Sequence, residues 1–135
     1  MRCLVDTSAF AALYRRNDTF HAQAKAVWTL LREQDAFLYT TRDVISETII
    51  LVRRREGFHQ ALQCGNDLWE SPVIEIIRPD ARQDRLAWEF FKKHSDKELS
   101  FVDCLSFAVM KELRIHRAFT FDQHFEQVGF EPVQP

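Results

Sequence analysis

Apolar and polar positions follow two different periods along the chain. Short apolar runs, typical of buried strands, are separated by longer stretches in which apolar residues recur every three or four positions, as on one face of a helix. The expected strands are Met1 to Val5, Ala36 to Thr41, Val73 to Pro79 and Arg117 to Asp122, and the prolines of segment 130–135 limit it to an edge strand. The expected helices are Ser8 to Asp18, Thr19 to Gln34 with Thr19 as its cap, Arg42 to Gly57, 58 to 70, Asp80 to Asp96, Ser100 to Ile115 and a short turn at 123–129.

The order of these elements predicts an α/β fold. Strands that are separated by helices favour a parallel or mostly parallel sheet covered on both faces. The chain has 135 residues and no internal repeat or linker, so we expect a single domain over residues 1–135. In open α/β sheets, ligands bind at the carboxyl ends of the strands. Asp6 and Asp122 both stand at such predicted ends.

The composition is that of a protein that folds without disulfides. Hydrophobic residues make up 46% of the chain, which supplies a core for a domain of this size. Cys3, Cys64 and Cys104 are widely spaced among apolar neighbours, as is typical of reduced thiols in a cytosolic core. No apolar run approaches the length of a membrane span, and Asp6 interrupts any signal-peptide core. We therefore expect a soluble, cytoplasmic protein without membrane contact.

The net charge of -2 and pI near 6.2 show that the chain lacks the global positive field common in non-specific nucleic-acid binders. Any nucleic-acid binding must therefore use a local patch. Arg53 to Arg55 and Lys92 to Lys97 are candidates, although cations at the end of a helix are favoured by its macrodipole, which is the simpler explanation. Trp28, Trp69 and Trp88 have helical core spacing and are expected to pack rather than to stack on bases.

Four acids stand in positions that need an explanation. Asp6 and Asp122 each follow a strand and precede a helix, so capping of that helix is an alternative reason for either acid. Glu47 lies in an apolar stretch of its helix, where it needs an ion pair with a nearby arginine or a functional role. Asp103 completes a capping box with Ser100 in a broadly hydrophobic helix, which leaves a structural and a functional explanation open.

Taken together, the four acids indicate a metal site. Converging carboxylates would repel one another and raise their pKa values unless a cation neutralised them. Carboxylate oxygens without histidine or cysteine select hard cations, so Mg²⁺ or Mn²⁺ is expected, and such sites commonly act on phosphates. The three glycines form no phosphate-binding loop, so phosphate would have to bind through the metal, which also activates water for in-line attack on phosphorus.

The sequence resembles the PIN-domain ribonucleases, specifically the toxin subunits of prokaryotic VapBC-type toxin–antitoxin pairs. The similarity runs along almost the whole chain, through LVDTSAF, VISE, LSFVDCLSFAVMK and AFTFDQHF. It implies a three-layer α/β/α sandwich around a short, mostly parallel sheet. It also implies a Mg²⁺-dependent endoribonuclease that hydrolyses RNA phosphodiester bonds, is usually a homodimer and is silenced by a cognate antitoxin.

The resemblance also implies roles for the acids. Asp6 matches the family's first metal-binding acid, and Asp103 matches its second principal metal ligand. Asp122 matches a fourth acid that helps to bind metal or to position water. Glu47 matches the remaining glutamate of the catalytic set. The catalytic residues expected are therefore Asp6, Glu47, Asp103 and Asp122.

Several residues and functions have weaker support. Thr7 and Thr120 match hydroxyl positions that support the acids or the substrate in the same family. None of the five histidines has metal-ligand spacing, and none is assigned a catalytic role. His124 is close in sequence to Asp122 and is expected at most to touch the rim of the site. One alternative function is phosphoryl transfer through an aspartyl intermediate at Asp6, although that chemistry usually needs an acid at the position of Ser8. The main alternative is a non-catalytic PIN-like module that binds RNA or protein.

Overall fold

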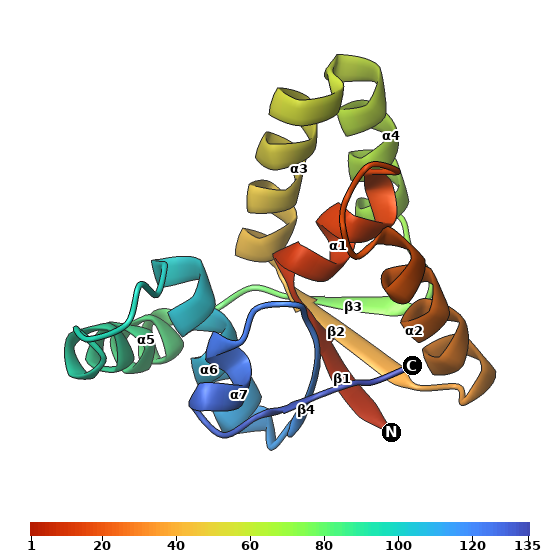
Figure 1. Ribbon diagram of the computed structural model, residues 1–135. Helices are drawn as coiled ribbons and strands as arrows, with labels where there is room; N and C mark the ends of the chain where they lie inside the picture. The colour runs from red at the N-terminus through yellow and green to blue at the C-terminus, as the bar shows by residue number, and fades with distance from the viewer.

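A parallel sheet of five strands forms the centre of the fold (Figure 1). The computed structural model describes all 135 residues. The strands lie in the order β3-β2-β1-β4-β5, and each neighbouring pair is parallel. Their bounds are Arg2–Val5 for β1, Phe37–Thr41 for β2, Ile74–Ile77 for β3, Arg117–Phe119 for β4 and Glu131–Pro132 for β5. Because the strands are parallel, the residues that follow them gather at one edge of the sheet.

Helices cover both faces of the sheet, which confirms the expected three-layer α/β/α sandwich. Helices α1 to α4 lie on one side and α5 to α7 on the other (Figure 1). The side chains of β1 alternate between the two layers, because Cys3 and Val5 pack with the first group and Leu4 with the second. The helices are α1 Thr7–Tyr14, α2 His21–Glu33, α3 Arg42–Glu56, α4 Phe58–Trp69, α5 Ala81–Lys93, α6 Phe101–Leu113 and α7 His124–Gln127.

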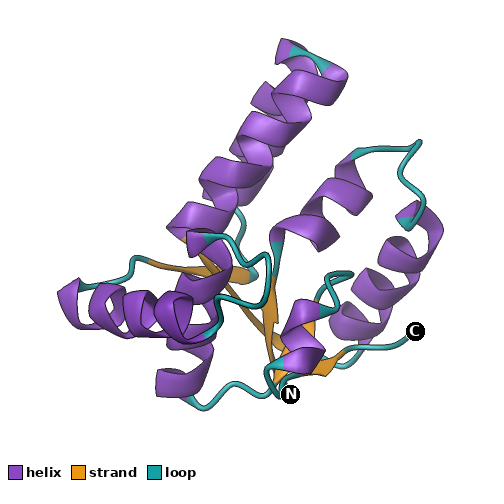
Figure 2. Cartoon of the chain, turned by 60° about the vertical axis from the view of Figure 1, so that its left-hand side comes forward, coloured by secondary structure: helices purple, strands orange, loops and turns teal.

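Helices α3 and α4 pack side by side and project from the body of the protein (Figure 2). Gly57 separates them, and its φ of 92° lies in a region that residues with a Cβ rarely adopt. The predicted stop of the third helix at Gly57 is therefore confirmed. This pair of helices, the α3–α4 hairpin, extends away from the sheet. The rest of the protein therefore covers α3 and α4 less than it covers α6.

The predicted end of the fourth strand at Asp122 is wrong, because β4 ends at Phe119. The backbone N–H groups that follow bind side chains instead of a neighbouring strand. Phe121 N–H donates to Ser8 Oγ at 2.9 Å, and Asp122 N–H donates to Thr120 Oγ1 at 3.0 Å. These bonds turn the chain at the carboxyl edge of the sheet and place residues 120–122 beside the start of α1.

The predicted cap of the second helix is also wrong. α2 begins at His21, and Thr19 lies in the preceding turn. Asp18 makes that turn, because its Oδ1 accepts the Phe20 N–H at 2.8 Å. A local aspartate turn thus replaces the threonine cap.

The expectation that all three tryptophans pack in the core is correct only for Trp28, which is partly buried against the α1–α4 side. Trp69 is 41% exposed and Trp88 is 51% exposed. Helical spacing correctly placed both of these rings on the apolar face of a helix, but no other element of the protein covers that part of the face. Trp88 stacks on Phe91 with ring centroids 5.3 Å apart, at the surface of α5.

The three cysteines are buried and unpaired, as predicted for reduced thiols. Burial raises the pKa of the Cys3 thiol to about 12, which keeps it protonated and unreactive. Among the seven helices, none has both the length and the apolar character needed to cross a bilayer.

Candidate functional site

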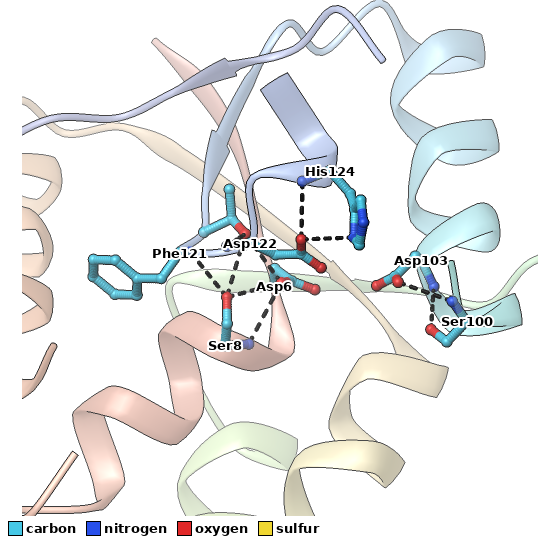
Figure 3. Close-up of polar contacts among 8 residues, drawn as sticks. Asp6, Ser8, Ser100, Asp103, Phe121, Asp122 and His124 are labelled. Carbon is cyan, nitrogen blue, oxygen red and sulfur yellow. Dashed lines mark hydrogen bonds and ion pairs between the residues drawn. The ribbon is translucent and has the colours of Figure 1, made fainter. Parts of the chain in front are cut away.

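Asp6 follows β1 and lies at the centre of the carboxyl edge of the sheet. Its side chain is 3% exposed and caps α1, and Oδ2 accepts hydrogen bonds from Ser8 Oγ at 2.9 Å and Thr120 Oγ1 at 3.1 Å (Figure 3). Burial and, to a lesser extent, the nearby charge of Asp103 raise the pKa of Asp6 from 3.8 to about 7, although these hydrogen bonds lower it. The capping explanation is therefore correct, but it leaves a buried and costly carboxylate.

Asp103 lies in the first turn of α6 and is 9% exposed. The predicted capping box is present: Oδ2 accepts the Ser100 N–H at 3.0 Å, and Ser100 Oγ accepts the Asp103 N–H at 3.0 Å. Burial raises the pKa of the Asp103 carboxyl, and the charges of Asp122 and Glu47 raise it as well, while the Ser100 bonds lower it. The cap uses one carboxylate oxygen, so Oδ1 remains for another partner.

Asp122 lies in the turn between β4 and α7, where Oδ1 accepts the His124 N–H at 2.9 Å. The His124 ring Nδ1 lies 2.9 Å from the same oxygen. Ligand atoms of Asp103, Asp122 and His124 all lie within 4.8 Å of one another. Figure 3 shows the carboxylates of Asp6, Asp103 and Asp122 directed toward one space between their elements.

Glu47 lies on α3, which packs against α6, and its side chain is half-buried. Its charge is close enough to raise the pKa of Asp103. The alternative explanation, an ion pair with a nearby arginine, is wrong because no basic side chain lies within ion-pair distance of Glu47. The structure therefore brings all four expected acids to one edge of the sheet.

The electrostatic balance of this edge favours a cation. The lysine and arginine ion pairs of the protein all involve other acids. The carboxylates of Asp6 and Asp103 are offset by the hydrogen bonds from Ser8, Thr120 and Ser100 and by the partial positive charge at the amino ends of α1 and α6, and not by a lysine or arginine. Several carboxylate oxygens without a fixed positive partner are the donor set that a hard divalent cation prefers.

The two threonines expected to support the site differ in what they contact. Thr120 donates to Asp6 and accepts the Asp122 N–H, so it joins two of the acids. Thr7 Oγ1 is buried without a hydrogen-bond partner, and Thr7 contacts Asp6 through its backbone N–H, which lowers the pKa of that carboxyl. The side chain of Thr7 therefore does not support the acids in the expected way.

Sequence reasoning missed the role of Ser8 and placed His124 only at the rim of the site. Ser8 Oγ lies 2.9 Å from Asp6 Oδ2 and 3.2 Å from Thr120 Oγ1, and it also accepts the Phe121 N–H. A serine two residues after an acid at the start of a helix was the available signal for Ser8. His124 gave only its closeness in sequence to Asp122, because the turn that folds its ring back cannot be read from spacing.

The fold and the site together define an α/β protein with carboxylates gathered at the carboxyl edge of a parallel sheet. The profile of the PIN domain family matches residues 3–131. The chain therefore belongs to the PIN domain family, and the resemblance seen in the sequence is confirmed.

The chain is 37% identical over 131 residues to the 23S rRNA-specific endonuclease VapC20 of Mycobacterium tuberculosis, and the match covers 97% of each chain. The crystal structure of VapC20, described as a Sarcin-Ricin loop cleaving toxin, superposes with a TM-score of 0.91 at 35% identity over 98% of this chain and 99% of that one. VapBC2 from Rickettsia felis has a TM-score of 0.73 at 14% identity, with 98% of each chain covered. FitAcB from Neisseria gonorrhoeae has a TM-score of 0.69 at 19% identity, with 98% and 97% covered. The last two share the fold.

Proposed function

We propose that this protein is a metal-dependent endoribonuclease, a hydrolase of RNA phosphodiester bonds, and the toxin of a toxin–antitoxin pair. The observation that carries the proposal is the gathering of Asp6, Glu47, Asp103 and Asp122 at one edge of the sheet without a lysine or arginine to neutralise them. Burying such charges costs stability, so a functional reason for them is needed.

Mg²⁺ or Mn²⁺ is the cofactor that this donor set fits. Asp6, Asp103 and Asp122 would hold the ion, because their oxygens face one space and two of these acids have a raised pKa. When bound, the ion supplies Lewis-acid stabilisation of charge at the phosphate and makes water easier to deprotonate. Membership of the PIN domain family agrees with this assignment.

The protein's own residues position the reacting groups. Ser8 and Thr120 bind the same oxygen of Asp6 and fix the direction of its other oxygen. His124 stands against Asp122 and restricts its rotation. Glu47 has neither a hydrogen bond nor an ion pair, so it is free to accept a proton from the attacking water.

The substrate that we propose is 23S rRNA. The support is the 37% identity with VapC20, which is named for 23S rRNA, over nearly the whole length of both proteins. The chain itself has no glycine-rich loop for phosphate, since Gly57, Gly65 and Gly129 all lie outside the acidic site. Contacts with the RNA must therefore come from the ion and from side chains.

Two exposed apolar surfaces support the proposed protein partners. A groove between α3 and α4, lined by Ile49, Phe58, Leu62 and Trp69 with Arg53 at its side, suits an apolar antitoxin segment that carries an acidic residue.

On the opposite layer, the exposed rings of Trp88, Phe91 and Phe101 form a cluster. We assign this cluster to the contact between two copies of the chain.

Cleavage of 23S rRNA by the purified protein tests the proposed function. We expect fragments with one defined end, mapped by primer extension, when Mg²⁺ or Mn²⁺ is present, and none in excess EDTA. Intact RNA under every metal condition, or cleavage that continues unchanged in EDTA, would overturn the proposal. Recovery of cleavage after metal is restored to the EDTA sample excludes damage to the protein as the reason for its loss.

A further inference from the structure

A second charged region lies at the opposite end of the sheet from the acids. An open cavity of about 430 Å³ is lined by Met1, Arg2, Arg114, His116 and Arg117. Arg2 begins β1 and Arg117 begins β4, so the cavity lies at the amino ends of adjacent parallel strands (Figure 1). The acids lie at the carboxyl ends, roughly 13 Å away along β1 at about 3.3 Å per residue.

The arginines of this basic cavity are oriented but poorly neutralised. Arg2 Nη1 donates to the Leu113 carbonyl at 2.6 Å, and its guanidinium lies over the Tyr39 ring, 5.3 Å from the centroid. The one acid within ion-pair distance of these arginines is Glu131, whose Oε2 lies 3.8 Å from Arg117 Nε, with the side chains 46% exposed for Arg117 and 69% exposed for Glu131. Such a long, solvated pair contributes little, so the cavity keeps a net positive charge.

The backbone at Arg114 supplies a second, independent observation. Arg114 ends α6 in the left-handed region, with φ at 56°. Glycine or asparagine is usual at such a helix end, because a larger side chain is strained there. An arginine at this position is costly for the helix and projects a positive charge into the cavity, which indicates a role for the side chain.

We propose that this basic cavity binds phosphate groups of the RNA backbone and so holds a part of the RNA away from the bond that is cut. The proposal rests on the proposed endoribonuclease function. Guanidinium groups match phosphate oxygens in geometry as well as in charge. The lining contains one hydrophobic residue, Met1, whereas the centre of a protein interface is normally apolar, so a nucleic acid suits the cavity better than a protein segment does.

Binding of a fluorescein-labelled 23S rRNA fragment, followed by anisotropy in EDTA to prevent cleavage, tests this proposal. Arg114→Gly and Arg117→Gln are each expected to weaken binding about three- to tenfold and to lower the slope of log K against log salt by about 0.7 to 0.9. Arg114→Gly also relieves the strained backbone, so its melting temperature should not fall. Arg16→Gln, at an exposed arginine without an ion pair, is the matched control and should leave binding unchanged.

Glu131→Gln gives a test that misfolding cannot imitate. It removes the only acid beside Arg117, so RNA binding should become tighter, by about two- to fivefold at low salt. Unchanged RNA binding in Arg114→Gly, Arg117→Gln and Glu131→Gln would overturn the proposal. Polyglutamate serves as a second probe that imitates an acidic protein segment. If the arginine variants keep their RNA binding but lose the polyglutamate binding of the wild type, the proposal is also overturned, and the cavity is assigned to an acidic protein segment.

The same proteins separate this proposal from the proposed function. RNA binding that depends on the cavity, in a protein that cleaves no RNA, would support the cavity and reject the nuclease. Metal-dependent cleavage, combined with binding that none of these substitutions changes, would support the nuclease and reject the cavity.

Discussion

Asp6 is both a helix cap and a member of the acidic site, and these two roles can be separated by experiment. Asparagine caps a helix as well as aspartate does, but it carries no charge for a cation. We expect Asp6→Asn to fold and to lose at least about a hundredfold in RNA cleavage. The control is Asp80→Asn, which changes the aspartate cap of α5 in the same way and should cleave RNA like the wild type. Equal loss in both variants would show that capping alone explains Asp6.

The two threonines near Asp6 make a second comparison at the scale of single residues. Thr120→Val removes hydrogen bonds to Asp6 and Asp122, so we expect about a tenfold loss of cleavage and a loss of about 1 to 2 kcal/mol in unfolding free energy. Thr7→Val replaces a buried hydroxyl without a partner and should leave both quantities nearly unchanged. Urea denaturation and initial cleavage rates measure the two effects, and a larger effect of Thr7→Val would contradict the hydrogen-bond pattern.

At the scale of elements, the periodic pattern predicted every strand and helix. The errors concern the ends of elements and the exposure of side chains, which depend on contacts between residues far apart in the sequence. β4 ends early because Ser8, from another element, takes the Phe121 N–H. Trp88 has core spacing but remains exposed, since spacing defines a face of a helix and does not say what covers it. Local preference therefore sets the elements, while packing sets their ends and their exposure.

The α3–α4 hairpin carries the prediction that belongs to this scale. Leu62→Asp places a charge in the apolar groove and is expected to abolish inhibition by the cognate antitoxin, while RNA cleavage continues. Phe37→Asp, at an exposed apolar residue of β2, is the matched control and should remain inhibited. The rate of RNA cleavage by each variant is measured in the presence and absence of antitoxin. Normal inhibition of Leu62→Asp would place the antitoxin elsewhere.

At the scale of the whole molecule, the topology explains how much of the site could be predicted. Asp6 and Asp122 follow β1 and β4, which pair with each other in parallel and end at the same edge of the sheet, so the meeting of the two acids followed from the pattern. Glu47 and Asp103 lie on helices, and only their apolar surroundings and the family resemblance pointed to the same place. The lack of a partner for Glu47 depends on side-chain packing, and the basic cavity depends on residues 1–2 lying beside residues 114–117. Neither can be predicted from the spacing of residues along the sequence.

The buried acids also predict how the stability of the metal-free protein depends on pH. The pKa of Asp6 is about 7 in the folded state against 3.8 ordinarily, so the folded protein binds this proton more tightly. The resulting stabilisation is complete below about pH 4 and is lost as pH rises through about 7, with an upper limit of roughly 4 kcal/mol. Urea denaturation in EDTA should show this fall in the wild type and a smaller one in Asp6→Asn. Identical pH profiles would contradict the burial of a titrating Asp6.

Calorimetric titration of Mn²⁺ into the metal-free protein tests the central claim, that the gathered carboxylates form a cation site. The wild type and Asp84→Asn, which changes an exposed acid of α5, are expected to bind Mn²⁺ alike. Asp103→Asn should weaken binding by more than about tenfold, because cation affinity follows the number of charged ligands. Binding by Asp103→Asn that matches the wild type, or no binding by the wild type, would contradict the account.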